Sequence, residues 1–173
     1  MTIGIVVPVA NESAEVGPRR MGKRHMLAVM VLLVVAVGVR LPKIGQSMWV
    51  DEMASVGFAS HSLNGFRDNI AQRDVHPPLY YLLLHFWIKL GTSDVWVRLL
   101  SLVIGIAVVG VACAIGWTIG GAEWGLASGA LAALSPGLVW PSQEARNYIL
   151  MTLWAGAALL FLVRGLRQMG NWA

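Results

Sequence analysis

Charged side chains are scarce in this sequence and unevenly spread. Only 13% of its 173 residues are Asp, Glu, Lys or Arg, against about 25% in soluble domains. Three windows carry no charge at all: 99–122, 124–143 and 147–163, of 24, 20 and 17 residues. A bilayer core takes roughly 20 helical residues, and a chain of this size cannot enclose three such helices in one core. The sequence therefore predicts an all-α, polytopic membrane helical bundle.

The cysteine content, the net charge and the spacing of possible metal ligands limit the classes of function that the sequence allows. The one cysteine, Cys113, lies inside a charge-free window and is expected to be a packing residue. The net charge of +4 comes from basic residues beside the windows, where they orient helices, so no nucleic-acid partner is predicted. No His, Cys, Asp or Glu residues stand at a compact metal-ligand spacing. The sequence thus predicts no cofactor and leaves a divalent metal open.

A fourth apolar window, 26–39, is short for a span. His25 and Arg40 at its ends are expected to extend towards the lipid headgroups and lengthen it. We predict a retained signal anchor rather than a cleaved signal peptide, because no small-residue cleavage pattern follows the apolar run. The expected organisation is a polar cytoplasmic leader 1–25, a membrane domain 26–167 and a short tail 168–173. The predicted spans are 26–42, 98–119, 126–141 and 147–163.

Whether the segment 77–90 spans the membrane determines on which side of the membrane the later segments lie. It is 14 residues long and holds His85 and Lys89, and segments of about 10–14 residues are more often interfacial or re-entrant than spanning. If it does not span, four helices cross the membrane, and Arg164 and Arg167 share the cytoplasmic side with the amino terminus, as the positive-inside rule favours. If it spans, those arginines face outward. We favour the first arrangement, with interfacial helices in a first outer loop, 43–97.

Glycines flank the predicted turn between two of the spans. Gly116 and Gly120 precede it, and Gly125 and Gly129 follow it, each pair four residues apart. Such spacing lets helices approach closely in a membrane. We expect tight packing there and assign it no chemistry.

Two adjacent carboxylates, Asp51 and Glu52, follow Trp49. They have a structural interpretation, in which Asp51 caps a helix and Glu52 favours its positive end. They also have a catalytic one, in which a carboxylate at the water–lipid boundary accepts a proton from an alcohol.

The remaining polar candidates are equally ambiguous. His76 stands before two prolines that favour a helix start, and it can also orient a phosphate or carboxylate. Arg98 is either a headgroup anchor or a clamp on a phosphate. Glu144, Arg146 and Tyr148 form either a solvated loop with a local ion pair or part of a binding site.

The order of these motifs resembles a known family. Trp49-Val50-Asp51-Glu52 is followed by His76-Pro77-Pro78-Leu79-Tyr80-Tyr81, by Val97-Arg98-Leu99-Leu100-Ser101 and by Ser142-Gln143-Glu144-Ala145-Arg146-Asn147-Tyr148. Across residues 26–167 this series is similar to the amino-terminal part of the GT-C glycosyltransferases that use polyprenyl-phosphate sugars. Within that class it resembles the protein mannosyltransferase and lipid A aminoarabinose transferase groups.

The resemblance implies an enzyme of the plasma (inner) membrane. It would transfer a sugar, with inversion, from a polyprenyl-phosphate donor to a hydroxyl of a lipid, glycan or protein acceptor at the outer membrane–water interface. Asp51 would be the base and Glu52 would help to hold the acceptor. Arg98, Glu144 and Arg146 would line the donor pocket, with His76 and Tyr148 as further substrate-binding residues.

Members of that class have many more spanning helices than this chain. We therefore expect the chain to correspond to the front part of a longer enzyme. The alternatives are an inactive truncated glycosyltransferase and a small non-enzymatic helical membrane protein, in which Asp51 and Glu52 would serve only as helix caps.

Overall fold

The structure, a computed structural model, describes residues 22–61 and 78–170. All regular secondary structure in these two ranges is helical, which confirms the predicted all-α class for the part described. The helices are α1 (Lys23–Arg40), α2 (Val50–Ser60), α4 (Leu79–Trp87), α5 (Asp94–Gly120), α6 (Ala122–Leu134), α7 (Pro136–Val139), the 3-10 turn η1 (Trp140–Ser142) and α8 (Tyr148–Gln168).

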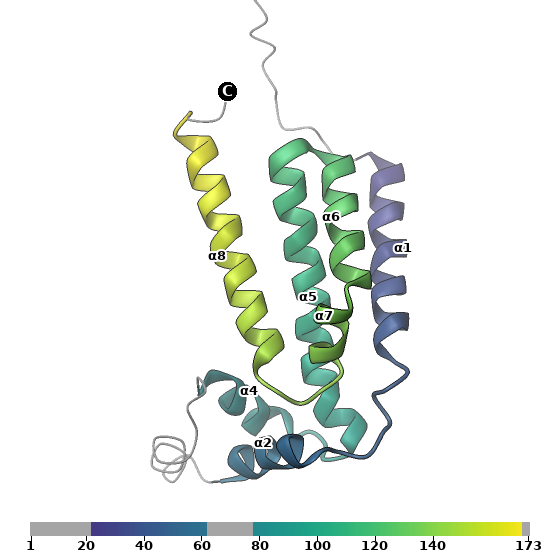
Figure 1. The fold of residues 1–173 in the computed structure, drawn as a ribbon, viewed down its shortest axis with the longest axis vertical. Coiled ribbons are helices and arrows are strands. Elements are labelled where there is room, and N and C mark those ends of the chain that lie inside the picture. Colours follow the sequence, from purple (N-terminus) through teal and green to yellow (C-terminus); the bar gives the residue numbers. More distant parts are fainter. Residues whose placement is uncertain (1–21, 62–77, 171–173) are drawn as a thin grey trace, which may run out of the picture.

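The long helices α1, α5, α6 and α8 run along the long axis of the molecule, and the short helices α2 and α4 lie across one end (Figure 1). The short helices α2 and α4 lie at the end where α1 finishes and where α5 and α8 begin, and we call this the α2 end. The basic residues Lys23, Arg24, Arg164 and Arg167 belong to the start of α1 and the last turns of α8, and so lie at the opposite end.

Two of the described helices are long and apolar enough to cross a membrane. These are α5, with 27 residues, and α8, with 21, and they correspond to the predicted spans 98–119 and 147–163. Helix α5 begins at Asp94 because the Ser93 hydroxyl caps it, accepting the Trp96 N–H at 3.2 Å. Only 17% of the apolar window of α8 is buried. Most of that helix therefore presents apolar side chains outward.

The other two predicted spans depart from expectation. Helix α1 covers 18 residues, and Arg40 at its end is 0% exposed rather than extended towards solvent. The predicted continuous helix 126–141 is wrong, because α6 ends at Leu134 and Ser135 adopts extended backbone angles. Pro136 has no N–H with which to continue the helical ladder. The predicted turn 120–125 reduces to Gly121, whose φ is 87°.

Helix α4 has nine residues, about 14 Å at roughly 1.5 Å per residue, which is well short of a hydrocarbon core. This agrees with the non-spanning prediction for 77–90. It packs instead on α2, where the His85 ring Nδ1 lies 2.7 Å from the Ala59 carbonyl oxygen and the rings of Phe58 and Tyr81 lie 5.5 Å apart. A buried core joins α4 to α5 and α8, and within it the hydroxyls of Tyr80 and Ser101 lie 2.8 Å apart.

Glycines bring α5 and α6 together, as their spacing predicted. A Cβ atom at Gly116 would clash with the Trp124 carbonyl oxygen, and one at Gly129 would clash with the Cys113 sulfur. The backbones can approach this closely only because no side chain stands between them.

Two alanine substitutions within α5 test this packing. Gly116→Ala should destabilise the protein by about 1–3 kcal/mol, because the carbonyl of Trp124 cannot move aside. Gly110→Ala is the matched control, since its Cβ would meet nothing within 4 Å, and should stabilise the helix by about 0.5–1 kcal/mol. Thermal unfolding of the purified variants measures both, and equal stability of the two would contradict close packing at Gly116.

Candidate functional site

The start of α2 is fixed by Glu52. Helix α2 begins at Val50, and the Glu52 carboxylate accepts the Trp49 N–H at 3.0 Å from its third helical position. This is the reciprocal half of a capping box. The capping that the sequence suggested for Asp51 therefore belongs to its neighbour.

The same carboxylate is paired with Arg98 across 46 positions of sequence. Arg98 donates from Nε to Oε1 at 2.8 Å and from Nη2 to Oε2 at 2.6 Å, and the Ala145 N–H donates to Oε1 at 2.8 Å. The two side chains, Arg98 and Glu52, are 2% and 1% exposed. Burial by itself raises the pKa of Glu52, but the hydrogen bonds from Arg98, Ala145 and Trp49 outweigh it, so the pKa lies below its usual value.

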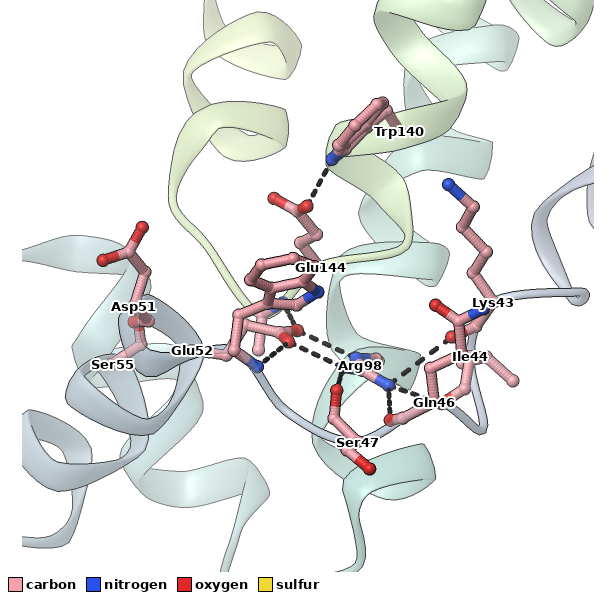
Figure 2. Close-up of polar contacts among 12 residues, drawn as sticks. Lys43, Ile44, Gln46, Ser47, Asp51, Glu52, Ser55, Arg98, Trp140 and Glu144 are labelled. Atoms are coloured by element: carbon pink, nitrogen blue, oxygen red, sulfur yellow. Dashed lines mark hydrogen bonds and ion pairs between the residues drawn. The ribbon is translucent and has the colours of Figure 1, made fainter.

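The rest of the Arg98 guanidinium organises the loop between α1 and α2 (Figure 2). Nη1 donates to the carbonyls of Lys43, Ile44 and Gln46, and Nη2 donates to that of Ser47. Each guanidinium nitrogen thus has an acceptor within the chain. Its burial is incompatible with a headgroup anchor, and its bonding leaves no N–H turned towards a phosphate. We therefore assign a structural role to Glu52 and Arg98. The pair holds α2, α5, the loop before α2 and the backbone of Ala145 together around the site.

A cavity of about 100 Å³ opens beside this ion pair. It is lined by Lys43, Gln46, Trp49, Arg98, Trp140, Gln143 and Glu144. The Trp140 indole N–H donates to the Glu144 carboxylate, and the Lys43 ammonium stands 4.7 Å from the centroid of the Trp140 ring. The cavity therefore combines aromatic faces, a carboxylate, two cations and two side-chain amides.

Asp51 and Arg146 form the more exposed part of the site. Arg146 Nη1 lies 2.9 Å from Asp51 Oδ2, with side chains 27% and 64% exposed. Arg146 also donates from Nη2 to the Tyr148 hydroxyl at 3.1 Å and lies 4.7 Å from the centroid of that ring. The local ion pair expected between Glu144 and Arg146 is thus replaced by separate partners, Trp140 for Glu144 and Asp51 for Arg146.

The structure brings six of the seven predicted site residues to the α2 end: Asp51, Glu52, Arg98, Glu144, Arg146 and Tyr148. His76 lies outside the described residues. In Figure 2 the carboxylates of Asp51 and Glu144 point to the same side, away from Arg98. In the described part of the chain no three His, Cys, Asp or Glu side chains gather as metal ligands would.

Sequence reasoning missed five residues of the cavity wall: Lys43, Gln46, Trp49, Trp140 and Gln143. Trp140 and Lys43 stand at the ends of apolar segments, where tryptophan and lysine are common membrane-interface residues. That signal marks an interface but does not distinguish a binding site. The amide of Gln46 carries no sequence signal, and Gln143 stands in the sequence motif of Glu144 but was given no role there.

No family model, curated protein or solved structure matches this chain.

The Glu52–Arg98 pair should be essential for folding. Glu52→Gln leaves the buried guanidinium without an anion and should cost about 3–5 kcal/mol of folding free energy. Asp51→Asn, one position earlier, removes an exposed ion pair and should cost no more than about 1 kcal/mol. Thermal unfolding of the purified variants at neutral pH compares them, and similar losses would contradict the frame role of Glu52.

The pH dependence of stability gives a second measure of the same pair. The pKa of Glu52 is lowered in the folded protein, so its stabilisation is fully present above the unfolded value of about 4.3 and is lost as the pH falls through the folded value. The stability difference between wild type and Glu52→Gln should therefore shrink on acidification. A difference that stays constant between about pH 7 and pH 3 would contradict an ionised Glu52.

Proposed function

We propose that this chain forms the front part of a membrane glycosyltransferase that transfers a sugar from a polyprenyl-phosphate donor to an acceptor hydroxyl, with inversion. The observation that carries the proposal is the meeting of Asp51, Glu144 and Arg146 at one end of an apolar bundle, beside an aromatic cavity. These are residues on which the family resemblance rests, and they come from segments far apart in the sequence.

In the proposed reaction the acceptor oxygen attacks the anomeric carbon of the donor sugar. The bond between that carbon and the phosphate oxygen breaks, and the bonding electrons leave with the polyprenyl phosphate. The acceptor proton passes to the carboxylate of Asp51, which is the base. Attack opposite the leaving group inverts the anomeric configuration.

The charges of the site suit this chemistry. Arg146 and Lys43 are the cations proposed to stabilise the phosphate as it leaves, because a charge held in advance needs no reorganisation during the reaction. Glu144 and the tryptophans of the cavity would contact the donor sugar. Glu52 and Arg98, whose bonds are fully used within the chain, would position Asp51 and the loop after Arg40 instead of touching substrate as the resemblance implied.

The proposed setting is the plasma membrane, crossed by α1, α5, α8 and the α6–α7 segment, with the amino terminus in the cytoplasm. The α2 end would then face outward, with α2 and α4 at the interface. Support comes from the two long apolar helices and from the basic residues of α1 and α8 at the opposite end, as the positive-inside rule favours.

A non-enzymatic membrane protein is the competing function. The polar groups of Glu52 and Arg98 find their hydrogen-bond partners within the chain. This favours the non-enzymatic function, because a purely structural ion pair needs no ligand. Asp51 distinguishes the two functions, since it is exposed and its loss should leave folding intact.

The substitution Asp51→Asn tests catalysis in the protein that carries this segment. Transfer from a polyprenyl-phosphate sugar should fall at least about a hundredfold, the low end for a general base, with normal membrane insertion and thermal stability. Asp94→Asn is the control, because Asp94 is exposed at the start of α5, at the same end of the bundle. Near-normal transfer by Asp51→Asn would refute the proposed base.

The proposed topology is tested separately. A reporter that works only in the cytoplasm should be active when fused after Ala173, because an even number of spans separates the two termini. A reporter that works only in the periplasm should be inactive at the same position. The reverse pattern would refute the four-span arrangement.

A further inference from the structure

Among the described residues, Arg40 is a buried arginine without a carboxylate partner. Its side chain is 0% exposed, and Nη1 donates to the carbonyl oxygens of Ala36 and Ala133, both at 2.9 Å, while Nη2 donates to that of Ala132 at 3.4 Å. Within residues 22–61 and 78–170 its Nε has no hydrogen-bond partner. A charge in such a position is costly unless something specific stabilises it.

The break between α6 and α7 explains the position of this guanidinium. In an unbroken helix the Ala132 carbonyl would accept the N–H of residue 136, but that residue is Pro136 and has none. The Ala133 carbonyl loses its helical partner because Ser135, with ψ of 119°, turns the chain away. Arg40 reaches from α1 to these two carbonyls.

The charge of Arg40 is stabilised by helix ends in place of a carboxylate. The carbonyls of Ala132 and Ala133 form the carboxyl-terminal end of α6, and that of Ala36 belongs to the last turn of α1. Free carbonyls at a helix carboxyl terminus carry partial negative charge and favour a cation. Helix breaks within apolar surroundings are tolerated when a neighbouring side chain satisfies the released backbone groups.

Residue 40 also holds the segment that follows the break. The Gln143 side-chain amide donates to the carbonyl of Arg40 at 3.2 Å and to that of Val39 at 3.4 Å. The neighbouring Ser142 is 0% exposed and donates to the Leu138 carbonyl at 2.5 Å. The end of α1 therefore contacts the chain on both sides of residues 134–142, the segment that carries Trp140 and leads to Glu144.

We propose that Arg40 is a positioning residue of the candidate site, which replaces the N–H missing at Pro136 and thereby fixes the place of Trp140 and Glu144. This role does not depend on the proposed sugar transfer. It requires only that Arg40 act through the break in α6.

A double-mutant cycle tests the link to Pro136. Arg40→Met should lower the midpoint of thermal unfolding by roughly 5 °C or more. In a Pro136→Ala background, where residue 136 regains an N–H, the same substitution should cost less than about half as much. Arg24→Met is the matched control, since Arg24 is an exposed arginine of the same helix, and it should cost the same in both backgrounds.

A thiol probe reports on the site itself. In a Cys113→Ala background, Ser142→Cys introduces a nearly isosteric thiol at a buried position. Adding Arg40→Met should raise the labelling rate of this introduced thiol by a water-soluble maleimide about tenfold or more, because the loop opens locally. A thiol introduced by Thr92→Cys, exposed at the same end, should react at an unchanged rate. The thiol at position 142 should also react at an unchanged rate when Arg24→Met is added instead.

Three results would overturn the proposal. They are an equal cost of Arg40→Met with and without Pro136, unchanged labelling of the thiol introduced at position 142, and labelling that rises as much with Arg24→Met. If Arg40→Met does not yield folded protein, Arg40→Lys in the two backgrounds provides the same comparison, because lysine keeps the charge but cannot reach both carbonyls with a planar pair of donors.

Discussion

A guanidinium removed from water needs compensating negative charge and oxygen acceptors for its N–H groups, and at Arg98 this requirement determines the structure of the α2 end of the molecule. Removing each ion from water costs several kcal/mol. The compensation comes from Glu52 and from four backbone carbonyls of residues 43–47. The same carboxylate starts α2 and binds the backbone of Ala145. One ion pair thus joins α2, α5 and two loops, and Asp51 meets Arg146 because these loops are held together.

The guanidinium of Arg40 is also buried, and its hydrogen-bond acceptors are backbone carbonyls. Its partners are two carbonyls left free at the end of α6 and the carbonyl of Ala36 in the last turn of α1. Each of the two arginines contacts a different segment of the cavity wall. Arg98 holds the loop that carries Lys43 and Gln46, and Arg40 lies against the segment that leads to Trp140, Gln143 and Glu144. The cavity wall consists largely of irregular backbone, and these buried charges supply the rigidity that regular helices would otherwise give.

The packing of the long helices depends on close backbone contacts and apolar surfaces, not on buried charges. Helices α5 and α6 are held together by backbone contact at glycines, whereas α8 leaves most of its apolar surface uncovered by the described part of the chain. Surface of this kind needs a lipid or protein neighbour. In the proposed setting that neighbour is the bilayer, together with further helices of a longer enzyme. The polar site would then lie where the apolar bundle ends, next to water and within reach of a lipid-borne donor.

The sequence by itself determined the features that depend on local composition. The charge-free windows located α5 and α8, the glycine spacing located the contact with α6, and the shortness of 77–90 located a helix that lies across the bundle. A non-spanning 77–90 also implies that Asp51 and Glu144 lie at one end of the bundle. Tertiary structure decided which charges are buried and what they bind. Asp51 and Glu52 are chemically alike neighbours, and only their directions on α2 make one exposed and the other the partner of Arg98. The contacts of Arg40 depend on the carbonyls of Ala132 and Ala133, which lie far from it in the sequence and lose their helical partners at the break. The sequence shows that Pro136 lacks an N–H. Only the tertiary structure shows which side chain takes the place of that N–H.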